Sequence, residues 1–159
     1  MFKKIFQAFK AKTAQSSQST LVDDLPEAIE WTVDNLTASG YLADFSLSSI
    51  AALDDFFETE KQEGGVLRRP DGGIILFAVA AYLGETLIAN YGGKWELSDE
   101  VSEDDLDMVL ILDGKPFYPV RVCQQRLKTA SPDGLQRAVT EFFQPVEHRP
   151  LQNDTNELE

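Results

Sequence analysis

The stretch that decides the fold is DGGIILFAVAAYLGETLIANYGGKW, residues 71–95. From Ile74 to Leu83 every residue is apolar or tyrosine. The length of this segment without a clear turn signal favours a helix over a buried strand. Asp71 is placed to cap the N-terminus of such a helix, and the glycine after Tyr91 is placed to end it. We therefore predict a helix that begins after Asp71 and ends at Tyr91.

A helix that is apolar all round lies either in a protein core or in a membrane. The uninterrupted apolar run is shorter than the roughly 20 residues that span a bilayer, and extending it takes in Glu85 and Asn90. We therefore predict a buried core helix. Gly84 costs about 1 kcal/mol relative to alanine in a helix interior. We expect a neighbouring element to pack closely against it; the alternative is a ligand that approaches the backbone there.

Composition limits the classes of function. The 159 residues are 43% hydrophobic and carry a net charge of −13, with a pI of about 4.4. Such a chain suits one folded domain with a sizeable core. Its acidity argues against nonspecific nucleic-acid binding, because phosphates attract basic surfaces. The one cysteine cannot form an intramolecular disulfide, and no motif for a cofactor is recognisable.

The chain divides into three parts. Residues 1–20 hold four lysines and no acid, whereas the ten basic and 27 acidic residues of 21–159 give −17. Residues 1–12 predict a basic amphipathic helix that binds a membrane surface, a partner or the acidic domain itself. The rest of the 1–20 segment is a polar linker. We expect one domain over 21–145 and a disordered acidic tail over 146–159. Lacking a signal peptide's apolar segment, the protein is expected to be bacterial and cytoplasmic.

Within the domain, two helices start near Asp24 and Ser46 and are expected to form a helical hairpin. The second would bury Ile50, Leu53 and Phe57, with its acids, Asp54 included, facing water. After the central helix we predict strands over 94–97, 107–112 and 115–117 and helices opening at Pro119 and Ser131. The Asp113-Gly114 pair is a strong hairpin signal. The predicted fold class is α+β: a mostly helical single domain with a small antiparallel sheet packed on the central apolar helix.

Residues 98–107, here called the acidic segment, carry six acids without a compensating base. These acids are Asp99, Glu100, Glu103, Asp104, Asp105 and Asp107. A solvated connecting loop and a docking surface for a basic protein are the leading interpretations. Carboxylates also bind Ca²⁺ or Mg²⁺, but the spacing departs from the EF-hand loop and lacks its glycine. We therefore predict no metal site.

Residues for catalysis are few. Cys123 falls on the apolar face of its predicted helix and His148 lies in the tail, so a Cys-His pair is not expected. Neither glycine pair of the central stretch continues into a phosphate-binding loop motif. Glu85 is the most notable single acid, since a buried carboxyl there would serve as a general acid or base. Arg68-Arg69 is one of the few basic spots, and is interpreted as an exposed loop or a weak anion site.

The segment from Ala80 to Trp95, followed by DGKPFYP and a closing helix, resembles small bacterial domains of unknown function. These domains share a Tyr-Leu-Gly-Glu helix that ends in a glycine pair and a tryptophan. Some of them occur beside secreted toxins as candidate immunity proteins. The resemblance covers about the second half of the chain and assigns no functional residue.

The sequence therefore favours a non-enzymatic, cytoplasmic module that binds a basic protein partner through the acidic segment, with an immunity protein as one concrete form. The alternative is a small carboxylate-dependent enzyme that uses Glu85 and acids of 99–107.

Overall fold

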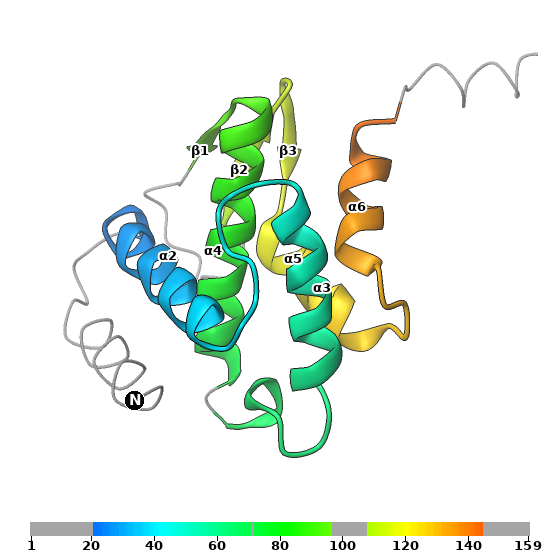
Figure 1. The fold of residues 1–159 in the computed structure, drawn as a ribbon. Coiled ribbons are helices and arrows are strands. Elements are labelled where there is room, and N and C mark those ends of the chain that lie inside the picture. Colours follow the sequence, from blue (N-terminus) through cyan, green and yellow to red (C-terminus); the bar gives the residue numbers. More distant parts are fainter. Residues whose placement is uncertain (1–20, 71, 97–107, 145–159) are drawn as a thin grey trace, which may run out of the picture.

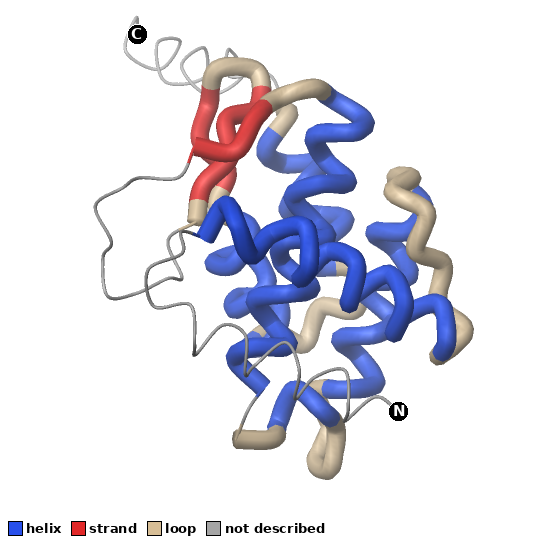
Figure 2. Tube along the Cα trace, turned by 90° about the vertical axis from the view of Figure 1, so that its left-hand side faces the viewer, coloured by secondary structure: helices blue, strands red, loops and turns tan. Residues whose placement is uncertain are grey.

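The computed structural model of the protein describes residues 21–70, 72–96 and 108–144 (Figure 1). Its elements are, in order, α2 (Leu21–Ala38), α3 (Ser48–Glu60), the short 3-10 helix η1 (Val66–Arg68), α4 (Gly72–Tyr91), β1 (Lys94–Glu96), β2 (Val109–Leu112), β3 (Lys115–Phe117), α5 (Pro119–Lys128) and α6 (Gly134–Phe142). Figure 2 shows the three strands gathered at one end of the helical body. The predicted class, a mostly helical α+β fold with a small antiparallel sheet, is confirmed.

Helix α4 lies at the centre of the domain, between α2 on one side and α3 and α5 on the other (Figure 1). Every residue from Ala78 to Gly84 is buried, because α2, α5 and β2 all pack against this helix. By length and composition α4 could also cross a membrane, but 67% of its most apolar window is buried within the domain. The prediction of a buried core helix is confirmed, and its all-round apolar surface follows from being covered on every side.

The end of α4 is set by its glycines. Gly92 has φ +76° and Gly93 has φ +134°, which other residues rarely adopt. A Cβ on Gly93 would also lie 2.6 Å from the carbonyl oxygen of Ile111. The helix therefore ends at Tyr91, as predicted, and the chain reverses directly into β1.

The sheet has the order β1-β2-β3, with both pairs antiparallel. Asp113 and Gly114 have φ +54° and +75°, so the predicted hairpin turn with positive φ at both positions is confirmed. β3 lies at an edge, as its proline required. Trp95 pairs with Leu110 and Leu110 pairs with Phe117, so these three apolar side chains lie abreast across the sheet.

The predicted helical hairpin is wrong. α2 packs on α4, whereas α3 packs on α6 and η1, and Figure 1 shows the two helices on opposite sides of α4. The connecting residues 39–47 cross over α4 instead of folding back. α2 already includes Leu21, which precedes the predicted start at Asp24, and it contains Pro26. Pro26 has no amide hydrogen to donate to the carbonyl four residues earlier, so α2 lacks one backbone hydrogen bond there.

The start of α3 differs from the prediction by half a turn. The helix begins at Ser48, but the Ser46 hydroxyl still accepts a hydrogen bond from the Ser49 amide at 3.3 Å. Ser46 therefore satisfies an amide of the first turn, which is the physical role that the sequence assigned to it.

Candidate functional site

The six acids predicted to bind a partner lie outside the described residues. The structure does place the two ends of the chain that carries them. Glu96, the last residue of β1, pairs with Val109, the first residue of β2. The acidic segment is therefore attached at both ends to the same end of one antiparallel ladder.

Glu85, the carboxylate of the enzymatic alternative, lies half-buried on α4. The indole Nε1 of Trp95 donates a hydrogen bond to its Oε1 at 3.3 Å. The acids of 99–107 that were to work with Glu85 lie outside the described residues. Within the described ranges no group of three or more His, Cys, Asp or Glu side chains is placed to hold a metal ion. Glu85 therefore has a positioning role, because it holds the tryptophan of β1 against α4.

The cysteine is buried, as predicted. Cys123 lies on the inner face of α5 with no exposed surface. Burial raises the pKa of its thiol, and the nearby charge of Asp54 raises it further. A thiol held in its neutral form is a poor nucleophile. His148, the other member of the Cys-His pair, lies outside the described residues.

The most elaborate polar site in the described structure was missed by the sequence analysis. Asp54 of α3 and Arg126 of α5 form a buried ion pair, with 2.7 Å between Oδ1 and Nε and side-chain exposures of 1% and 0%. Asp54 was predicted to face water, and this prediction is wrong. The missed signal is spacing: Asp54 follows Ile50 by four residues and precedes Phe57 by three, which places it on the apolar face.

Four donors saturate the Asp54 carboxylate. Oδ1 accepts hydrogen bonds from Arg126 and from the Leu135 amide at 2.9 Å. Oδ2 accepts from the amide and the side-chain nitrogen of Gln136, both at 3.1 Å. A carboxylate has about four lone-pair sites, so none is left for a substrate. Asp54 thus caps the first turn of α6 from another helix, where its charge also complements the helix dipole.

Arg126 joins three elements. Its Nη2 donates to the Asp54 carbonyl at 3.0 Å, the Glu58 carboxylate at 2.8 Å and the Pro132 carbonyl at 3.2 Å. Burial acts against its charge, but the hydrogen bonds to Asp54 and Glu58 outweigh that effect and raise its pKa. The bond from Arg126 in turn lowers the pKa of Glu58. This cluster fixes α3, α5 and α6 relative to one another, and its chemistry is structural.

Tyr82 and Asn90 of α4 hold the crossing loop. The Tyr82 hydroxyl accepts from the Phe45 amide at 3.0 Å and donates to the Ser49 hydroxyl at 2.8 Å. Asn90 donates to the Phe45 carbonyl at 2.9 Å. Phe45 has φ +62°, an uncommon conformation for a bulky side chain. These contacts, with the Phe45 ring packed on that of Tyr82 at 5.0 Å, hold it there.

We expect Tyr82→Phe to lower the free energy of unfolding by about 1–2 kcal/mol, because the buried Ser49 hydroxyl and the half-buried Phe45 amide each lose a hydrogen-bond partner. Tyr91→Phe is the control, since the Tyr91 ring is exposed and stacks on Phe143 at 4.2 Å. It should change stability by less than about 0.5 kcal/mol. Urea denaturation of both variants measures this. Equal losses in the two would show that the Tyr82 hydroxyl does not pin the loop.

The conspicuous residues of the central stretch thus have structural roles. Tyr82 and Asn90 hold the loop. Gly84 leaves room for the Trp95 ring, because a Cβ there would lie 2.3 Å from it. Glu85 orients that ring, and the glycine pair after Tyr91 ends the helix. Arg68 and Arg69, the basic spot noted in the sequence, are both exposed. No protein-family model, curated protein or solved structure matches the chain.

Proposed function

We propose that this protein is a non-enzymatic interaction module that binds a basic protein partner through the acidic segment. The observation that carries the proposal is the attachment of that segment. Its six acids lie in nine consecutive residues without a base, and the chain on either side is held by the Glu96–Val109 pair. The described chain therefore enters and leaves the acidic segment at one end of the sheet.

Concentrated negative charge of this kind chiefly raises the rate of association with a basic partner and the selectivity for it. It attracts a basic surface over distances of about a Debye length and disfavours acidic competitors. The same charge repels nucleic-acid phosphates. The buried carboxylate of Asp54 accepts four hydrogen bonds within the protein and is not open to a substrate. This supports an interaction role over a catalytic one.

An immunity protein that neutralises a basic toxin in the bacterial cytoplasm is a concrete form of this proposal. The proposal draws on the resemblance of Ala80–Trp95 to small bacterial domains, some of which occur beside secreted toxins. Attachment to a membrane surface through residues 1–12 is a separate version of the proposal, which vesicle binding of the full-length and truncated chains tests.

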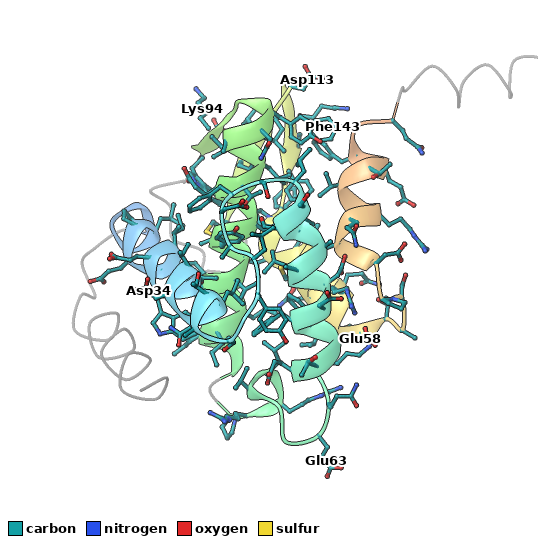
Figure 3. The ribbon with its side chains drawn as sticks, in the orientation of Figure 1. Asp34, Glu58, Glu63, Lys94, Asp113 and Phe143 are labelled. Atoms are coloured by element: carbon teal, nitrogen blue, oxygen red, sulfur yellow. The ribbon has the colours of Figure 1, made fainter. Side chains whose placement is uncertain are left out.

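The test is co-purification from the native cells at low salt with a charge-neutralised variant. This variant carries Glu100→Gln, Glu103→Gln, Asp104→Asn and Asp105→Asn. The matched control carries Glu30→Gln, Asp34→Asn, Asp55→Asn and Glu141→Gln, four exposed acids on other elements. Figure 3 shows Asp34 pointing outward from α2. Each variant removes four of the charges that make up −13, leaving −9, so only the position of the charge differs.

We expect the wild type and the matched control to recover the same basic protein, and the neutralised variant to recover at least about tenfold less of it. Recovery should also fall as salt rises, because screening weakens exposed charge pairs. If both variants recovered equally less of the partner than the wild type does, binding would depend on net charge alone and not on the acidic segment. A wild-type protein that purifies without a partner would overturn the proposal.

A further inference from the structure

A pocket of about 550 Å³ lies between the end of α3, the 61–68 loop and the end of α5. This volume is large enough for a small molecule, and the hollow is shallow and widely open to solvent. Its charged lining residues are Lys61, Arg68, Lys128 and one acid, Glu63. Three cations and one carboxylate leave a charge of +2 around this hollow, in a protein whose net charge is −13. The pocket is therefore a local exception in an acidic molecule.

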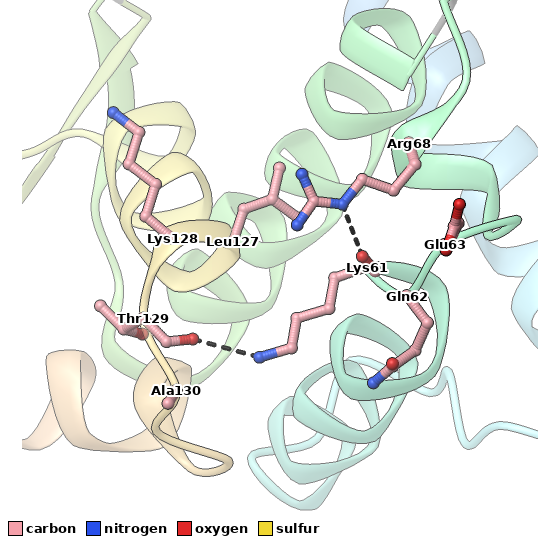
Figure 4. Close-up of a pocket in the computed structure, with 8 residues that line it drawn as sticks. All are labelled: Lys61, Gln62, Glu63, Arg68, Leu127, Lys128, Thr129 and Ala130. Atoms are coloured by element: carbon pink, nitrogen blue, oxygen red, sulfur yellow. Dashed lines mark hydrogen bonds between the residues drawn. The ribbon is translucent and has the colours of Figure 1, made fainter.

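One hydrogen bond from Nε orients the Arg68 side chain, and its two terminal amino groups remain available to a ligand. Its Nε donates to the Lys61 carbonyl at 2.6 Å, one of the carbonyls that the end of α3 leaves without a helical partner. Figure 4 shows the guanidinium reaching over the pocket toward Leu127. No hydrogen bond from its two terminal amino groups is found within the described residues. These two groups form the planar fork that binds phosphate or carboxylate oxygens in pairs.

Lys61 provides a second fixed donor. Its Nζ donates to the Thr129 carbonyl at 3.1 Å and lies 3.5 Å from the Glu58 carboxylate. An ammonium has three donors, so one remains for a ligand. Figure 4 shows the Lys61 and Arg68 side chains bordering the same space, whereas the Lys128 side chain points away from both. The Glu63 carboxylate lies apart from the Arg68 guanidinium in the same view.

Leu127 and Ala130 add apolar surface to the lining of the pocket. We propose that this pocket binds a small organic phosphomonoester: the phosphate between Arg68 and Lys61, the organic group against Leu127. A phosphomonoester carries a charge close to −2 at neutral pH, opposite in sign to the net charge of the lining residues. Glu58, which lies 3.5 Å from Lys61, offsets part of that positive charge. The site is independent of the acidic segment and of its proposed partner.

The test is titration calorimetry of the full-length protein with phenyl phosphate, inorganic phosphate and benzoate as probes. We expect saturable binding of phenyl phosphate, weaker binding of inorganic phosphate, which lacks the ring, and the weakest binding of benzoate, which carries a single charge. Absence of saturable phenyl phosphate binding at millimolar concentration would overturn the proposal. Benzoate binding as tightly as phenyl phosphate would overturn the assignment to phosphate.

Variants locate the site. Arg68→Gln should weaken phenyl phosphate binding about tenfold, since it removes a charged pair of donors. Lys128→Gln at the rim should weaken it about twofold, and Glu63→Gln should strengthen it about twofold, because exposed charges act weakly. Arg69→Gln is the matched control: its side chain does not line the pocket, so affinity should stay unchanged. Loss of binding in Arg69→Gln equal to that in Arg68→Gln would contradict the site.

Each variant is first checked for an unchanged unfolding midpoint. If Arg68→Gln lowers it, Arg68→Lys replaces it, keeping the charge but losing the fork, with a smaller expected loss of about threefold. An unchanged affinity in Arg68→Lys together with an unchanged affinity in Lys61→Gln would overturn the proposal.

Discussion

Replacing Asp54 with alanine is expected to lower the free energy of unfolding by about 3–5 kcal/mol, the largest effect of any single substitution considered for this protein. The change leaves the Arg126 charge buried without its main partner, since the two side chains are 0–1% exposed. It also removes the cap of α6, because the Leu135 and Gln136 amides lose their acceptor. Urea denaturation followed by circular dichroism measures the difference.

The control is Asp55→Ala at the adjacent, exposed position of α3, which should change stability by less than about 0.5 kcal/mol. The double variant Asp54→Ala with Arg126→Met should lose less than the two single variants together, because the second change removes the stranded charge. A loss below about 1 kcal/mol in Asp54→Ala would contradict the role given to this ion pair.

Replacing Gly84 with alanine should destabilise the protein by about 1–3 kcal/mol, although alanine is the better helix former. A Cβ at this position would lie 2.3 Å from the Trp95 ring and 2.9 Å from the Leu110 side chain. Both neighbours belong to the sheet, whose packing on α4 would have to shift. The unfolding midpoint in urea measures the effect.

Gly73 of the same helix provides a control of opposite sign. A Cβ there meets nothing within 4 Å, so Gly73→Ala should stabilise the protein by up to about 1 kcal/mol through reduced chain entropy. If both substitutions stabilised the protein, the sheet would not pack closely against α4 at Gly84, and the explanation given for this glycine would be wrong.

Features that depend on local chemistry were predicted well from the sequence. Asp113-Gly114 specifies a turn because both positions need positive φ, and the glycines after Tyr91 end α4 for the same reason. The apolar run to Leu83 predicts a core helix without knowledge of its neighbours. The close packing expected at Gly84 is confirmed, although the sequence alone did not name Trp95 and Leu110 as its neighbours.

Features that depend on distant residues were not predicted. Asp54 and Arg126 are 72 residues apart, so neither residue type by itself indicates the other as its partner. Their positions on the apolar faces of two helices were the signal that could have found them. The path of 39–47 across α4 depends on Tyr82 and Asn90, whose partner Phe45 lies 37 and 45 residues away. The basic pocket also requires Lys61, Arg68 and Lys128 to be brought together by the fold.

The measurement that tests the proposed function most directly is the association rate between this protein and the partner recovered at low salt, followed as salt is raised. If the acidic segment steers binding, the wild-type rate should fall at least about tenfold toward high salt. The variant with the four neutralised acids of 100–105 should start slower and depend much less on salt, whereas the matched control should follow the wild type. Identical salt dependence in the neutralised variant and the wild type would contradict the account.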